Sequence, residues 1–77
     1  MTADVIKMLA VGMAAGLGML GPALGLGLIG YGALTGISRN PEASGPILTN
    51  MILVAAFTEA LGIYVLIVAI ILAMIVK

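Results

Sequence analysis

Glu59 is the residue of this 77-residue chain with the clearest potential for chemistry. It stands alone in an otherwise uncharged stretch from Ala43 to Val76, where no Lys, Arg or His can pair with it. An ionised side chain in the middle of a membrane costs at least ~2.5–3.5 kcal/mol, so a carboxyl group there keeps its proton or binds a cation. The pattern therefore predicts a proton or cation site. The alternative, a structural Glu neutralised inside its own bundle, lacks a basic partner in the apolar stretches.

The composition excludes most other kinds of site. The chain has no Cys and no His, so thiol, disulfide and the usual zinc and acid–base sites are missing. Its formal net charge is zero, which gives no basic patch for nucleic acid. Hydrophobic residues make up 64% of the chain and charged residues 8%, whereas a soluble domain carries about 25% charged residues. The solvent for most of this chain is therefore lipid.

The other five charges divide the chain into two long apolar segments. One uncharged run extends over residues 8–38 and the second over residues 43–76, interrupted only by Glu59. Each exceeds the ~20 residues that cross a bilayer. Backbone in hydrocarbon must satisfy its own hydrogen bonds, so both segments are predicted to be helices. The five charges at the ends and in the middle are Asp4, Lys7, Arg39, Glu42 and Lys77.

The polar residues between the segments predict a tight connection. Pro41 disfavours a helical conformation for Asn40, which ends the first helix. Ser44 or Gly45 is expected to cap the second helix, with Pro46 in its first turn, where a missing N–H is tolerated. The predicted fold class is an all-α membrane protein, a two-transmembrane antiparallel hairpin that assembles into a homo-oligomeric ring. The hairpin forms one unit over residues 1–77, with helix 1 at about 5–39, the polar loop at about 40–44 and helix 2 at about 45–76.

The N-terminus and the orientation leave alternatives. Lys7 before an apolar run is also typical of a signal peptide, but this run is about twice the usual core of ~7–15 residues. The positive-inside rule compares Arg39 in the loop with Lys7 and Lys77 at the ends, and these few charges do not decide which side the loop occupies.

Small residues lie on two opposite faces of the first helix when each residue is given ~100° of rotation. Two opposed faces predict close neighbours on both sides, and identical neighbours make head-to-tail contacts that can close into a ring. The alternative is that the glycines reflect tight packing in a small bundle. The first small face consists of Gly12, Gly16, Ala23, Gly27 and Gly30; the second consists of Ala14, Gly18, Gly21, Gly25, Gly32 and Gly36.

Larger residues separate the two small faces. One group is predicted to receive the second helix and the other to face the interior of the ring. The first group is Met8, Met19, Leu26 and Ile29, and the second is Leu17, Leu24, Leu28 and Tyr31.

The glycines also match a dinucleotide-binding expression at residues 25–30 and 16–21. That GxGxxG fingerprint requires a preceding strand, a βαβ unit and an acidic residue about 20 positions later. Neither a preceding strand nor a βαβ unit is predicted here, so nucleotide binding by this chain is rejected.

Taken together, the residues resemble the c subunit of the F-type ATP synthase, the proteolipid family that forms the rotor ring. The resemblance covers nearly the whole chain and rests on Gly25-x-Gly27, the loop Arg39-Asn40-Pro41-Glu42, and Glu59 twenty residues after the Arg. The family loop more often reads Arg-Gln-Pro, so Asn40 is a mild departure.

The resemblance implies a role for each of these positions. Glu59 is the expected ion carrier, protonated in lipid and discharged where it meets stator subunit a. Arg39, Asn40, Pro41 and Glu42 are expected to seat the central stalk subunits gamma and epsilon, which places the loop in the cytoplasm of a bacterial plasma membrane. The expected partners are copies of the chain, these subunits and membrane lipid. No cofactor is expected besides the transported H⁺, and the chain itself is expected to catalyse no covalent reaction.

The same resemblance bears on which ion is carried. Sodium-type members have Gln at the position of Leu26 and Ser-Thr at the positions of Ala60 and Leu61. The apolar residues here remove oxygen ligands that sodium needs and favour protons.

Three further residues are expected to support the proton site. They are the backbone carbonyl of Phe57, the hydroxyl of Tyr64 and the hydroxyl of Thr58. Tyr64 lies about 140° around the helix from Glu59, so it is expected to reach the Glu59 of a neighbouring copy. Thr58 keeps a sodium-carrying ring open as an alternative, and a small pore-forming or holin-like hairpin is the rival from another class.

Overall fold

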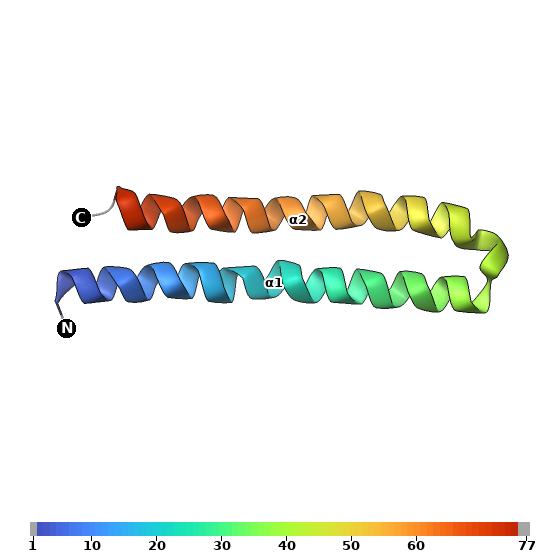
Figure 1. Cartoon of the computed structure of the whole chain (residues 1–77), viewed down its shortest axis with the longest axis horizontal. Coiled ribbons are helices and arrows are strands. Elements are labelled where there is room, and N and C mark those ends of the chain that lie inside the picture. Colours follow the sequence, from blue (N-terminus) through green and yellow to red (C-terminus); the bar gives the residue numbers. More distant parts are fainter. Residues whose placement is uncertain (1, 76–77) are drawn as a thin grey trace.

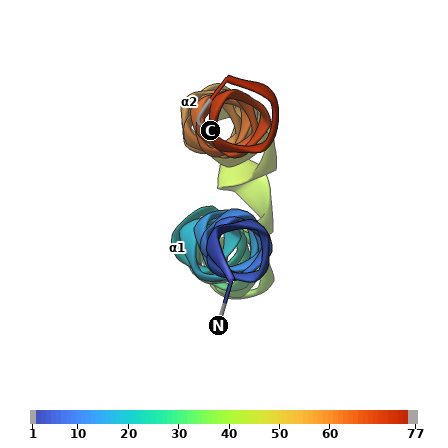
Figure 2. The same cartoon turned by 90° about the vertical axis from the view of Figure 1, so that its left-hand side faces the viewer.

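The computed structural model describes residues 2–75, which form a hairpin of two long antiparallel helices (Figure 1). Helix α1 comprises Ala3–Arg39 and helix α2 comprises Ser44–Met74, and a short 3-10 turn, η1, joins them at Pro41–Ala43. Seen end on, the two helices lie side by side (Figure 2). The hairpin is 58 Å long. The predicted two-helix hairpin is confirmed.

Local hydrogen bonds define both ends of α1. The Thr2 hydroxyl accepts a 3.2 Å hydrogen bond from the Val5 N–H, and this cap begins the helix at Ala3, earlier than the predicted residue 5. At the other end the Asn40 N–H donates to the Gly36 carbonyl over 2.9 Å. Arg39 in the last turn is favourable because the negative end of the helix dipole lies there.

The start of α2 differs from the prediction. The N–H of Ala43 donates to the carbonyl of Asn40, and that of Ser44 donates to the carbonyl of Pro41, so the 3-10 turn continues directly into the helix. Ser44 is already helical, with φ −58° and ψ −39°, and the cap position falls on Ala43, which makes no side-chain cap hydrogen bond. The expected cap at Ser44 or Gly45 is therefore wrong, because the turn begun at Pro41 supplies the first helical geometry.

Glycines of α1 set the distance between the two helices. A Cβ atom added to Gly18 would lie 2.6 Å from Val65 Cγ1, and one added to Gly25 would lie 3.3 Å from Thr58 Cγ2. No glycine among residues 2–75 has a positive φ angle. These glycines are therefore needed for space and not for an unusual backbone conformation.

Helix α2 packs between the second small face of α1 and the large group that was predicted to receive it. It contacts the second small face at Gly18, Gly25 and Gly36, and Leu26 and Ile29 of the large group are half-buried. Of the large group, Met19 reaches the interface, with its sulfur 3.2 Å from a Cβ built on Gly62. Branched side chains of α2 occupy gaps left by missing side chains, which brings the helices closer than two bulky surfaces would. The glycines that meet nothing within 4 Å in the hairpin are Gly12, Gly16, Gly21, Gly27, Gly30 and Gly32, together with Gly45 at the start of α2.

We expect Gly18→Ala to destabilise the hairpin, because its new methyl group would lie 2.6 Å from Val65 Cγ1. Overpacking of this kind costs roughly 1–3 kcal/mol. Adding Val65→Ala should restore most of the loss by removing the clash. Thermal unfolding of the monomeric protein in detergent micelles, followed by circular dichroism, measures both effects.

Gly16→Ala is the matched control, because its methyl group meets nothing within 4 Å in the hairpin. Equal unfolding temperatures for Gly18→Ala and the double variant with Val65→Ala would show that this register is wrong.

Candidate functional site

Glu59 lies midway along the hairpin, between its charged ends. Thr58 of α2 packs against Gly25 of α1, so Glu59 is level with about residue 24 of that helix. At ~1.5 Å per residue, Lys7 and Arg39 are each roughly 25 Å away along the axis. The hydrocarbon core is about 30 Å thick. If Lys7 and Arg39 lie outside the hydrocarbon core, Glu59 therefore lies near the centre of that core.

The Glu59 side chain is exposed. It takes part in none of the side-chain hydrogen bonds found among residues 2–75, which are made by Thr2, Thr49, Asn50 and Thr58. The same residues contain no group of three His, Cys, Asp or Glu side chains that could hold a metal ion. At mid-length the hairpin thus presents a carboxyl group that no side chain among residues 2–75 pairs.

A groove of about 410 Å³ lies on the other side of α2 at the same height. Leu61 and Tyr64, two of its lining residues, are turned about 140–160° from Glu59 around the helix. Glu59 and the groove therefore occupy opposite lateral faces of the hairpin. The lining residues of this first groove are Val54, Phe57, Thr58, Ala60, Leu61 and Tyr64.

The groove brings together three residues predicted to support the ion site. Phe57 and Tyr64 are largely exposed, while Thr58 is half-buried and donates its hydroxyl to the Val54 carbonyl over 2.9 Å. This bond leaves the Thr58 oxygen only as an acceptor. Leu26 is half-buried on α1. Within one hairpin Phe57, Thr58 and Tyr64 line the groove, on the face that Glu59 does not occupy, and Leu26 does not line it.

A second groove, of about 500 Å³, lies between the helices on the terminal side of the first. Leu61 and Tyr64 line both grooves, so the two are adjacent. Sequence reasoning did not single out Pro22. A proline inside a predicted membrane helix was the signal that could have identified it. The lining residues of this second groove are Ala14, Gly18, Pro22, Leu61, Tyr64, Val65 and Val68.

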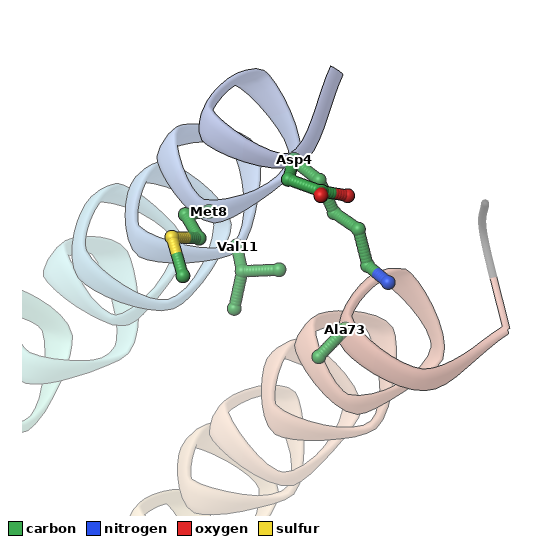
Figure 3. A pocket seen from close by; sticks show the side chains of 5 residues that line it. Asp4, Met8, Val11 and Ala73 are labelled. Atoms are coloured by element: carbon green, nitrogen blue, oxygen red, sulfur yellow. The ribbon is translucent and has the colours of Figure 1, made fainter. Parts of the chain in front are cut away.

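The open end of the hairpin has a separate groove of about 430 Å³, lined by Asp4, Lys7, Met8, Val11 and Ala73. Figure 3 shows Asp4, Met8 and Val11 on α1 and Ala73 on α2. Val11 lies about 20 Å from the level of Glu59 at ~1.5 Å per residue. This groove is therefore at the membrane surface and does not belong to the carboxyl site.

The loop end of the hairpin carries the charged residues Arg39 and Glu42. Arg39, Asn40, Pro41 and Glu42 are all exposed there, at the end of the hairpin farthest from the chain termini (Figure 1). Their exposure leaves this end of the hairpin free for contact with other proteins.

Most apolar side chains of the hairpin have no protein cover. Among residues 2–75, only Ala33, Gly62 and Ala69 are buried. Leu28 and Phe57 remain 72% and 70% exposed. Both helices are long and apolar enough to cross a membrane. Lipid or further protein chains must therefore cover these surfaces.

Comparison with known proteins identifies the family. Residues 9–72 match the family model of the ATP synthase C subunit. The chain is 57% identical over 72 residues to the ATP synthase c subunit of Dehalococcoides mccartyi, covering 94% of this chain and 95% of that protein. It is 47% identical to the ATP synthase c subunit of Petrotoga mobilis, over 86% and 69% of the two chains. It is 49% identical to the ATP synthase c subunit of Prochlorococcus marinus, covering 86% of this chain and 82% of that protein. With this similarity over nearly its whole length and its hairpin of two membrane-spanning helices, the chain belongs to the ATP synthase c subunit family, a membrane-sector rotor component of the enzyme complex.

Proposed function

We propose that this chain carries protons across the membrane by reversible protonation of Glu59, coupled to rotation of a ring of identical hairpins. The observation that carries the proposal is the position of Glu59, exposed and without a hydrogen-bond partner from residues 2–75, midway between the charged ends. A charge in hydrocarbon is costly, so Glu59 crosses lipid only in its neutral, protonated form.

Opposite lateral faces of the hairpin suit a head-to-tail ring. Glu59 lies on one face, and the first groove lies on the other face at the same height. In such a ring the carboxyl group of one copy enters the groove of the next copy. The Phe57 carbonyl can accept a hydrogen bond from the protonated carboxyl group, and the Tyr64 hydroxyl supplies a second hydrogen-bonding group.

A ring is also favoured by energetics. Moving one proton across the membrane yields about 2.3 kcal/mol per 100 mV. One site therefore provides too little energy for a costly synthesis, whereas many identical sites add their steps. The hairpin itself performs no covalent chemistry in this mechanism, and the nucleotide sites belong to other subunits of the complex.

Two other contacts complete the mechanism. Glu59 loses its proton where it meets stator subunit a, because a basic residue there stabilises the carboxylate. The exposed loop Arg39–Glu42 seats the central stalk subunits gamma and epsilon, which places the loop on the cytoplasmic side.

Apolar neighbours favour protons over sodium. Sodium needs several oxygen ligands, but Leu26, Ala60 and Leu61 offer none from their side chains. The Thr58 hydroxyl already donates a hydrogen bond to the Val54 carbonyl. Its oxygen alone is a poor replacement for a full set of ligands.

We expect Glu59→Gln to abolish ATP-driven proton pumping in membrane vesicles that contain the assembled complex. The amide cannot exchange a proton, although its size is nearly the same. Glu59→Asp should retain part of the activity. The fluorescence quenching of a pH-sensitive dye measures pumping, and the ATPase activity of the detached catalytic sector should stay unchanged in both variants. Full pumping by Glu59→Gln would disprove the proposed role.

The reaction of Glu59 with a carbodiimide tests which ion is bound, because the reagent attacks the protonated acid. Sodium should not protect the wild-type protein at neutral pH. The triple variant Leu26→Gln, Ala60→Ser, Leu61→Thr should gain sodium protection, because it restores oxygen ligands. Mass spectrometry of the labelled protein gives the rate of modification. Strong sodium protection of the wild type would instead identify a sodium-carrying ring.

Electron microscopy of the purified oligomer should show one closed ring of hairpins with α1 and α2 in separate layers. Reconstituted alone into vesicles, the ring should not conduct protons, since a protonated Glu59 in lipid provides no continuous path. Unaided conduction would favour the pore-forming alternative.

A further inference from the structure

A proline inside α1 frees a backbone acceptor near the middle of the membrane. Pro22 lies within the helix Ala3–Arg39 and has no N–H, so the carbonyl oxygen of Gly18 lacks its regular donor four residues later. Gly18 opposes Val65, about 9 Å along the axis from the level of Glu59 at ~1.5 Å per residue. This depth is inside the hydrocarbon, where an unsatisfied backbone group costs several kcal/mol.

Side chains of the hairpin do not replace the missing donor. Among residues 2–75, the hydroxyls of Thr49 and Thr58 and the amide of Asn50 donate to carbonyls of α2, and none of them donates to Gly18. The Tyr64 hydroxyl makes no hydrogen bond in the same part of the chain. An acceptor without its donor and a phenol without a partner therefore remain.

Gly18, Pro22 and Tyr64 all line the second groove. Its volume of about 500 Å³ exceeds the share of one water molecule in the liquid, about 30 Å³, many times. A buried water needs two to four polar partners, and prolines in membrane helices are tolerated where waters satisfy the freed carbonyl. The groove supplies the room, and its lining residues Gly18 and Tyr64 carry the two polar groups that the water needs.

We propose that the second groove holds an ordered water molecule between the carbonyl oxygen of Gly18 and the hydroxyl of Tyr64. The water donates one hydrogen bond to the Gly18 carbonyl and one to the Tyr64 oxygen, so the Tyr64 hydroxyl keeps its hydrogen for a neighbouring Glu59. Because Tyr64 also lines the first groove, this water fixes the phenol beside the position where a neighbouring Glu59 enters. Only this last step rests on the proposed function.

Solid-state NMR with polarisation transfer from water tests the site on the assembled oligomer in lipid, labelled with ¹³C at the glycine carbonyls. The wild-type protein should show transfer to the carbonyl of Gly18 and none to that of Gly25, whose regular donor, the Ile29 N–H, is present. Pro22→Ala should abolish transfer to Gly18, because the new N–H of residue 22 donates a hydrogen bond to the Gly18 carbonyl. Alanine is the best helix former, so this variant is expected to fold.

Tyr64→Phe is the second variant, since it keeps the ring of the side chain and removes the hydroxyl. It should lose part or all of the transfer to Gly18. Absence of transfer in the wild type, or unchanged transfer in Pro22→Ala, would overturn the proposal. A cross-peak between the Gly18 carbonyl and a side chain of a neighbouring copy would also overturn it, because a protein group would then occupy the place of the water.

Proton pumping by Glu59→Gln separates this proposal from the proposed function. Lost pumping combined with no water at Gly18 would reject the water site alone. Retained pumping combined with water at Gly18 would reject the role of Glu59 and leave the water site intact.

Discussion

Hydrocarbon offers neither a hydrogen-bond partner nor a counter-ion, and this constraint organises the whole chain. Backbone groups must pair within each segment, which requires long helices. Charged side chains must remain outside, and five of the six formal charges are at the ends of the apolar segments or in the loop between them. Glu59 is the exception. A carboxyl group in the middle of α2 meets the constraint when it is protonated, and the proposed function uses that proton.

Packing between the helices determines where that exception is displayed. The glycines of α1 accept Val65 and Thr58 at short distance, which fixes the register of the two helices. The register aligns Glu59 with the centre of α1 and turns it away from the interface. The first groove is then at the same height on the other lateral face. A hairpin with a carboxyl group on one face and a hollow on the other is suited to contacts that repeat in one direction.

Much of this arrangement could be predicted from the sequence, and the failures have physical causes. The hairpin and the depth of Glu59 follow from the lengths of the uncharged runs, which hydrocarbon thickness limits. Helical periodicity showed the faces of α1 but not which face α2 would take, because small residues favour any close neighbour, in the same chain or in another. The cap at Ser44 was wrong because the turn that begins at Pro41 outweighed a local side-chain preference. Residues lining the second groove could not be grouped before the register was known.

In the proposed function, the exposure of Glu59 allows a single carboxyl group to couple ion flow to movement. A carboxyl group held between α1 and α2 could exchange its proton only if the hairpin opened, which would expose backbone and break the packing at Gly18 and Gly25. Glu59 is on the outer surface instead, so exchange requires only a change in what covers it. Lipid accepts the neutral form and rejects the carboxylate, because the charged form costs several kcal/mol more there. In the proposed ring, a copy that has released its proton cannot move into lipid until it binds another, and the direction of movement therefore follows the side from which that proton arrives.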